Sequence, residues 1–173
     1  LDGVTGVQTC ALPILDAVSH IEGVLAKAFI GRKVGQLGTL LDADRELLGL
    51  ELGEAIRMGR IPQDAPKEKK IHAMQRKSVL GMNAILSMSL ALGRTIAAGQ
   101  GKELWQLIRE ISSDTMAKFI AANAKGEKKT VADLKKMDYD QLQALYRKVA
   151  ADAIKEGKTL YELLRAQLPV YPV

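Results

Sequence analysis

The chain has 173 residues, of which 47% are hydrophobic, 4% aromatic and 26% charged, and its formal net charge is +5. This length and apolar content suffice for a buried core and require no more than one domain. Leu and Ala are abundant, whereas aromatic residues and long β-branched runs are scarce, a balance that favours helices over sheets. The modest positive charge permits weak attraction to polyanions and does not by itself indicate a nucleic-acid-binding or membrane-binding protein.

The N-terminal segment differs from the rest of the chain. Val4–Ile14, VTGVQTCALPI, has no charge and no helical or alternating period, and it contains the only cysteine, Cys10. It resembles the translation of a sequencing-library adapter; the alternative is part of a signal peptide, which lacks support because the basic n-region and the small-residue cleavage site are missing. We therefore expect residues 1–14 to be a non-native segment that is extended or poorly packed. If Cys10 is set aside, disulfides, thiolate metal sites and a cysteine nucleophile are excluded.

The first predicted helix runs from about residue 16 to residue 30, with Asp16 as its cap and Gly31 as its stop. His20 lies in this helix without a second ligand one turn away, so we interpret it as a surface or boundary residue. The glycines between residues 31 and 38 lack the Gly-Lys-Ser/Thr ending of a phosphate loop and indicate a helix connection. The apolar stripe of the helix consists of Val18, Ile21, Leu25 and Phe29.

A second amphipathic helix is predicted from residue 36 to about residue 58. The carboxylates of this helix have two interpretations. They could pair for acid–base chemistry or metal binding, or they could form a solvated polar face. Arg45 and Arg57 stand among them, so the solvated face is preferred. The carboxylates are Asp42, Asp44, Glu46, Glu51 and Glu54.

Residues 59–78 are predicted to form a loop because they combine Pro62 and Pro66 with a basic run. The basic side chains suggest phosphate-backbone binding, but no aromatic residue is interleaved to stack bases. A solvated charged loop is the preferred interpretation. The basic residues are Lys67, Lys69, Lys70, Arg76 and Lys77.

Leu80–Ala98 is the longest uncharged run, and it predicts a central helix that is apolar on nearly every side and therefore buried. Gly81, Gly93 and Arg94 shorten the apolar run below the roughly 20 residues that a bilayer requires, which argues against a membrane span. The expected core positions are Leu80, Ala84, Ile85, Met88, Leu92 and Ile96.

The C-terminal part is predicted to be helical as well. A helix begins near Leu104, a short turn over Val131–Leu134 follows Thr130 as its cap, and a further helix begins at Asp138 and ends at Gly157. Gln141 stands where a capping box with Asp138 is expected, and a last short helix covers 159–166. The stripe of the first of these helices consists of Leu104, Leu107, Ile108, Ile111, Thr115, Phe119 and Ile120, with Trp105 beside it, and that of the helix after Asp138 of Leu142, Leu145, Tyr146, Val149 and Ala153.

Several segments together resemble one known family. Gly81–Ala91, GMNAILSMSLA, resembles the G-A-N-A-I-L-x-x-S-L-A helix of enolase (phosphopyruvate hydratase). Asp16–Arg32 is similar to the family's A-V-x-x-V-N-x-x-I-x-x-x-L-I-G-K helix, and Leu37–Leu50 resembles the I-D-x-x-L-x-x-L-D helix that follows it. Leu160–Glu162 and Leu168–Val173 resemble the L-Y-x-x-L stretch and the L-P-V-P strand that lead into the enolase barrel. These segments occur in the family's order.

The resemblance implies that residues 15–167 are a mainly α, bundle-like fragment of the α+β N-terminal capping domain of an enolase, with insertions near 59–78 and 102–158. Residues 168–173 then begin the link to an absent barrel. The parent would be a cytoplasmic glycolytic lyase that dehydrates 2-phosphoglycerate to phosphoenolpyruvate with magnesium. Family enolases are homo-oligomers, and the partner of this fragment would be the remaining strands and barrel of the enolase chain.

The resemblance transfers no catalytic, cofactor-binding or metal-binding residue to this sequence, because the family's magnesium carboxylates and its lysine base lie on the barrel. The fragment is therefore expected to be inactive alone and to bind no magnesium. A second interpretation is a freestanding all-helical protein-interaction module with basic loops. No specific nucleic-acid partner is expected under either interpretation.

Overall fold

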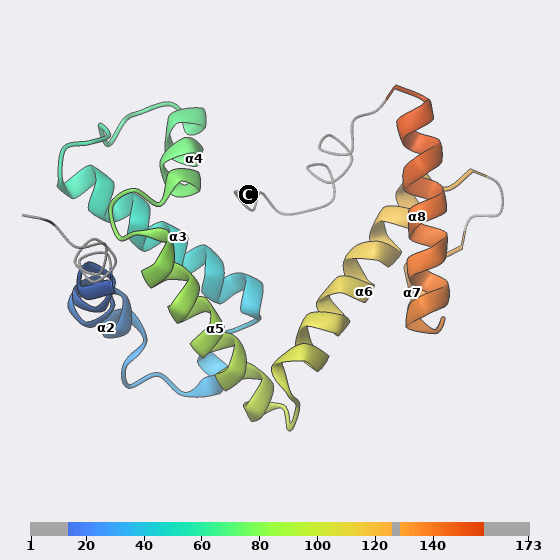
Figure 1. Ribbon diagram of the computed structural model, residues 1–173, viewed down its shortest axis with the longest axis horizontal. Coiled ribbons are helices and arrows are strands. Elements are labelled where there is room, and N and C mark those ends of the chain that lie inside the picture. Colours follow the sequence, from blue (N-terminus) through green and yellow to red (C-terminus); the bar gives the residue numbers. More distant parts are fainter. Residues whose placement is uncertain (1–13, 126–128, 158–173) are drawn as a thin grey trace, which may run out of the picture. The chain divides into compact units, whose positions relative to one another are not determined.

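The computed structural model describes residues 14–125 and 129–157, and Figure 1 shows that these residues are mainly helical, as predicted. No strand occurs within these ranges. The described residues fall into two compact units, which divide between Leu104 and Trp105. The predicted helix 159–166 and strand 168–173 lie outside the described residues, as do residues 1–13 of the segment 1–14 that was expected to be extended or poorly packed. The last residue of that segment, Ile14, is helical and 59% exposed.

The first unit begins with a continuous helical stretch, made of residues 14–20, the π-helical turn η1 (Ile21–Leu25) and α2 (Ala26–Phe29). Asp16 lies inside this stretch, so the prediction that it caps the helix is wrong. Its end at Gly31, with φ +84°, agrees with the predicted stop, because only glycine adopts this conformation without strain. A short 3₁₀ turn, η2 (Val34–Gln36), leads to α3 (Leu40–Arg57). The glycines of this segment therefore connect helices, as expected.

The long helices α3 and α5 (Met82–Gly99) pack against each other, and η1 contacts both. Their shared core includes Leu25, Leu47 and Leu80, each at most 1% exposed. Leu92 and Ile96 add to it from α5. Within the first stripe, Leu25 and Phe29 are buried as predicted, but Val18 is 45% exposed.

The central helix is less buried than its composition suggested. Met82, Leu86 and Leu90 repeat every fourth residue on one side of α5, and their side chains are 59%, 54% and 38% exposed. The prediction that the helix is enclosed on nearly every side is therefore wrong for this face of the first unit. The opposite face contacts α3, η1 and η2 and buries Ala84, Ile85, Leu92, Gly93, Ile96 and Ala97.

The predicted loop 59–78 contains a helix, α4 (Lys67–Arg76). The reason is that Pro66 lies at the N-cap, where its fixed φ and missing N–H are tolerated, and that Lys, Glu, Gln, Ala and Met are good helix formers. Lys77 ends the helix in the left-handed conformation, with φ +46°. The prediction of a loop holds only for the residues that flank α4.

The second unit contains α6 (Leu104–Asn123), α7 (Val131–Leu134) and α8 (Tyr139–Lys155). The predicted caps Thr130 and Asp138 are present, because the Thr130 side chain accepts a hydrogen bond from the Asp133 amide and the Asp138 side chain accepts one from the Asp140 amide. The predicted capping box between Asp138 and Gln141 is not formed in the described structure. Phe119 is fully buried and meets the Tyr146 ring edge-on at 4.9 Å between centroids. The unit therefore has its own apolar core, formed by Met116, Ala117, Phe119, Ile120, Leu134, Leu142, Val149, Ala150 and Ala153.

Candidate functional site

The junction before α5 is held by a buried carboxylate. Glu51 of α3 is 0% exposed, and its Oε1 and Oε2 accept hydrogen bonds from the backbone amides of Val79 (2.9 Å) and Leu80 (2.8 Å). Both oxygens are therefore satisfied by main-chain donors, which is how proteins accommodate a buried carboxylate. The interpretation of Glu51 as part of a solvated face is wrong, and a structural role replaces it.

His20 binds the carbonyl group of Leu80. Its Nδ1 lies 2.8 Å from the Leu80 carbonyl oxygen, which accepts the hydrogen bond. The main chain of Leu80 is thus bound by Glu51 of α3 through its N–H and by His20 through its C=O. His20 is partly buried at this boundary, as predicted, and the contact joins the first helical stretch to the start of α5.

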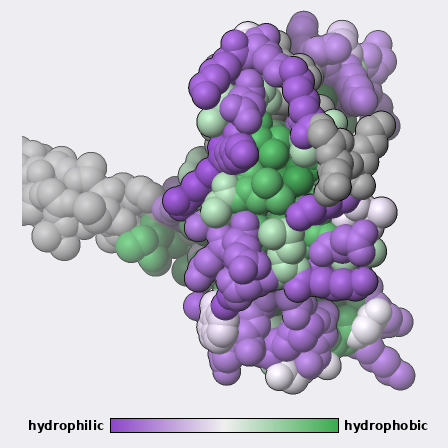
Figure 2. All heavy atoms as spheres, turned by 90° about the vertical axis from the view of Figure 1, so that its right-hand side faces the viewer, coloured by the Kyte–Doolittle hydropathy of each residue, from purple (hydrophilic) through white to green (hydrophobic). Residues whose placement is uncertain are grey.

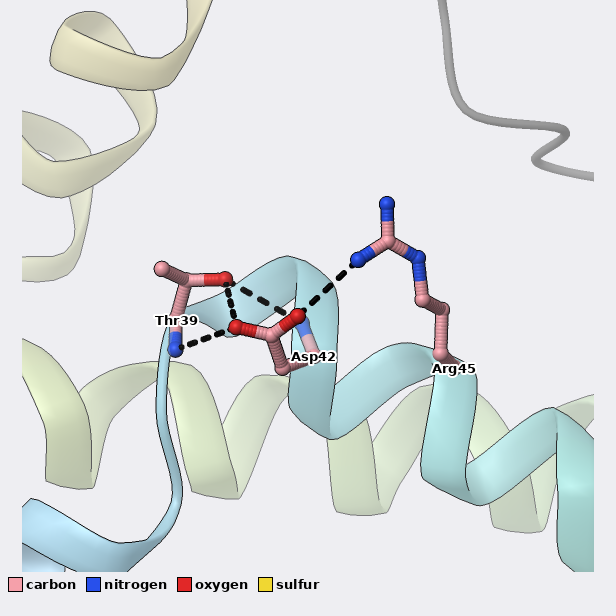
Figure 3. Close-up of polar contacts among 3 residues, drawn as sticks. All are labelled: Thr39, Asp42 and Arg45. Carbon is pink, nitrogen blue, oxygen red and sulfur yellow. Dashed lines mark hydrogen bonds and ion pairs between the residues drawn. The ribbon is translucent and has the colours of Figure 1, made fainter.

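The carboxylate at the N-terminus of α3 lies on the solvated face, as predicted. Figure 3 shows Asp42 Oδ2 accepting hydrogen bonds from the Thr39 amide (3.0 Å) and hydroxyl (2.6 Å), while Arg45 Nη1 donates to Asp42 Oδ1 at 2.9 Å. The hydrogen bond from the Thr39 side chain is the main reason that the pKa of Asp42 lies below its ordinary value. This arrangement is a helix cap with an ion pair, and it does not assemble a catalytic carboxylate pair.

The remaining predicted carboxylates of α3 also have individual roles. Glu54 pairs with Arg57 within the helix at 2.6 Å, and Glu46 receives a two-pronged contact from Arg32. Asp44 differs, because burial raises its pKa and its Oδ1 has no hydrogen-bond partner in the described structure. A hydrogen bond with Ser89 opposes the rise in the pKa.

A cleft lies beside α3 and α4 in the first unit, with a cavity volume of about 470 Å³. Basic side chains line it: Arg60 from the segment after α3, and Lys69, His72 and Arg76 from α4. The other lining groups are mainly small or apolar, and Glu51 is among the lining residues. We call this the α3–α4 cleft. The sequence prediction missed it because the basic residues were interpreted as a loop, in which no common face exists.

Further hollows lie in the second unit. One, of about 380 Å³, has a lining that includes the apolar residues Ile120, Leu145 and Val149 together with lysines and acidic residues. Figure 2 shows apolar residues bordered by hydrophilic ones on the side of this unit where α8 lies. The Lys125–Glu156 pair belongs to the charged part of the lining.

Another hollow of the second unit, of about 600 Å³, lies beside Trp105. Trp105 is 59% exposed, and the Arg109 guanidinium lies over the Tyr139 ring at 4.5 Å from its centroid. The sequence analysis placed Trp105 beside the apolar stripe of its helix, which agrees with this exposure. It did not anticipate the stacking of Arg109 on Tyr139, because that contact joins two different helices.

Within residues 14–125 and 129–157, no group of three or more His, Cys, Asp or Glu side chains is placed to hold a metal ion. Among the same residues, no helix is long and apolar enough to cross a membrane.

No family model, no curated protein and no solved structure matches the chain.

Proposed function

We propose that the first unit is the helical part of an enolase capping domain and that the parent protein is a magnesium-dependent phosphopyruvate hydratase. The proposal rests on the ordered sequence resemblance of Asp16–Arg32, Leu37–Leu50 and Gly81–Ala91 to enolase segments. The observation that best supports it is that these segments form helices that pack together in one unit. A cytoplasmic location and homo-oligomeric assembly follow from the same proposal.

The hydrogen bonds of Glu51 and His20 to the main chain of Leu80 are consistent with a segment that must be positioned accurately. Leu80 directly precedes the resembling run, and its main chain is bound to both Glu51 and His20. In enolases, proton abstraction beside a carboxylate creates a doubly charged intermediate that magnesium must stabilise, and such electrostatic stabilisation is usually the largest catalytic contribution. The family's magnesium ligands belong to its barrel, so this chain alone is proposed to be inactive.

The first test is an assay of the purified chain with 2-phosphoglycerate and excess magnesium. We expect no phosphoenolpyruvate above background. Activity that follows the chain through purification and disappears with a chelator would contradict the inactivity and show that the catalytic groups lie within this sequence.

A second test addresses the parent. The DNA that flanks this coding sequence is read, and the extended open reading frame is expressed and assayed in the same way. Barrel codons and magnesium-dependent dehydration are expected. An extended protein that folds and fails to dehydrate 2-phosphoglycerate would overturn the enolase proposal.

A freestanding helical interaction module is the second candidate function. The observation that favours it is the hollow with exposed Trp105 and the stacked Arg109 and Tyr139, because Trp, Tyr and Arg are the residue types that most often dominate binding at protein interfaces. The flanking codons separate the two candidates, since an interaction module requires no barrel. Substituting Trp105 with Ala should weaken partner binding in the second case and leave parental dehydration unchanged in the first.

A further inference from the structure

The side of α4 that lines the α3–α4 cleft is basic. Lys69, His72 and Arg76 are spaced by three and four residues, so they lie along one face of the helix. All three line the same cavity, and Arg60 joins them from the segment that follows α3. Folding of residues 67–76 into a helix therefore gathers three basic side chains next to Arg60 around one hollow.

No acidic side chain in the described part of the chain pairs with the three basic residues of α4. The cleft contains one carboxylate, that of Glu51, and each of its oxygens already accepts a backbone amide. Arg60 Nη1 donates to the Ser78 carbonyl oxygen at 3.0 Å, a neutral acceptor that leaves the charge of the guanidinium uncompensated. The cleft thus concentrates positive charge next to a wall that includes Ala55, Ile61 and Val79.

The walls of the cleft are held by main-chain contacts. The Arg60 amide donates to the Ala55 carbonyl oxygen at 2.9 Å, which folds the segment after α3 back onto that helix. In the segment that ends α4 and follows it, the Val79 amide is bound to Glu51 and the Lys77 amide to the Ala73 carbonyl oxygen. The backbone that carries the basic groups is therefore fixed before any ligand arrives, which reduces the ordering cost of binding.

We propose that the α3–α4 cleft binds a small multivalent oxyanion of the phosphate-ester class. Guanidinium groups of arginine bind two phosphate oxygens at once, and the lysine ammonium adds charge without the same geometric demand. The cavity volume of about 470 Å³ is suited to a small molecule, and the apolar wall suits the carbon part of an ester. The cleft involves α4, in the segment where the enolase resemblance places an insertion, so this site is additional to the proposed parental activity.

The test uses the full, isotope-labelled chain with pyrophosphate and inorganic phosphate as probes at physiological ionic strength. We expect saturable amide shifts at Arg60, His72, Arg76 and Ser78, with pyrophosphate binding more tightly than phosphate. The double substitution Lys69→Gln and Arg76→Gln should weaken pyrophosphate binding by about tenfold, because it removes charge-assisted hydrogen bonds. Unchanged amide spectra outside the cleft would show that this variant is folded.

The matched control removes the same charge elsewhere. Lys118→Gln with Lys155→Gln lowers the net charge equally in the second unit. Its affinity for pyrophosphate should stay within about twofold of that of the unsubstituted chain. A third variant, Ala73→Leu, fills the cleft without changing its charge and should also weaken binding.

Three outcomes would overturn the proposal. The first is an equal loss of affinity in the cleft variant and the charge control, which would indicate net charge alone. The second is full binding by Ala73→Leu, because it would place the anion outside the cavity. The third is a single-stranded oligonucleotide that binds more tightly per phosphate than pyrophosphate at the same salt concentration, because it would indicate an extended nucleic-acid surface.

Discussion

At the scale of single residues, Glu51 shows how one buried side chain connects two distant parts of the chain. Its two acceptor oxygens match two amide donors, so an amide side chain of the same size would present a donor to one of them. We expect Glu51→Gln to lower the free energy of unfolding by about 1–3 kcal/mol, the usual cost of leaving a buried polar group unsatisfied. Urea unfolding measures this change.

The control for this prediction is Glu46→Gln, on the same helix. Glu46 pairs with Arg32 near the surface, where solvent screens the interaction, so the loss of stability should be smaller. Equal effects of the two substitutions would contradict the structural role assigned to Glu51.

Two aspartates near the start of α3 should respond to pH with opposite signs. Burial raises the pKa of Asp44, so the ionised form destabilises the folded state, and this penalty grows as pH rises from the ordinary aspartate value to the raised one. The Asp44→Asn variant should therefore be more stable than the unsubstituted chain near neutral pH. The difference in stability should vanish below about pH 4, where Asp44 of the unsubstituted chain becomes protonated in both the folded and the unfolded state.

The control is Asp42→Asn, because hydrogen bonds from Thr39 lower the pKa of Asp42. Its carboxylate contributes stability that is present above the ordinary value and is lost as pH falls through the lowered one. The Asp42→Asn variant should be less stable than the unsubstituted chain near neutral pH and similar to it in strong acid. Urea unfolding at several pH values checks both signs; the same sign for both variants would contradict the assignment.

At the scale of elements, α4 depends on the residue that ends it. Lys77 has φ +46°, a conformation that costs a residue with a Cβ about 1 kcal/mol and costs glycine almost nothing. We expect Lys77→Gly to raise the free energy of unfolding by up to about 1 kcal/mol. Thermal or urea unfolding measures the gain.

Lys70→Gly provides the comparison within the same helix. Lys70 lies in the interior of α4, where glycine costs about 1 kcal/mol relative to a good helix former, so this substitution should destabilise. If both glycine variants destabilised equally, residues 67–76 would not end in the left-handed conformation described above.

The same element shows why local sequence interpretation failed here. Two prolines and a basic run resemble a loop when the residues are considered individually, but Pro66 at a cap position permits the helix that follows it. By contrast, Thr130 and Asp138 were identified correctly from sequence, because a short polar side chain before a helical pattern is itself the physical cause of a helix start.

At the scale of the whole molecule, each unit has a separate core. Phe119 is fully buried in the second unit, and Leu47 is fully buried in the first. We expect Phe119→Ala to cost about 3–5 kcal/mol within its own unit. Amide hydrogen exchange should then accelerate in α6 and α8 and remain unchanged in α3 and α5.

Leu47→Ala should give the reverse pattern, with faster exchange in α3 and α5 only. Substitutions in distinct cores without shared partners are additive, so the double variant should show the sum of both effects. Faster exchange throughout the described residues in either single variant would show that the two cores unfold as one.

By itself, the sequence determined the helical class, the caps Thr130 and Asp138, and most positions of the apolar stripes, because these depend on interactions within a few residues of one another. Val18 and Ile108 are exceptions within those stripes, with 45% and 48% of their surface exposed. Only the tertiary structure decided that Glu51 is buried and that Met82, Leu86 and Leu90 are exposed, since their environments depend on which helices pack against α3 and α5. The α3–α4 cleft is likewise a feature that only the tertiary structure decided. Its basic residues are evident in the sequence, but their convergence requires α4 to form and to pack beside α3.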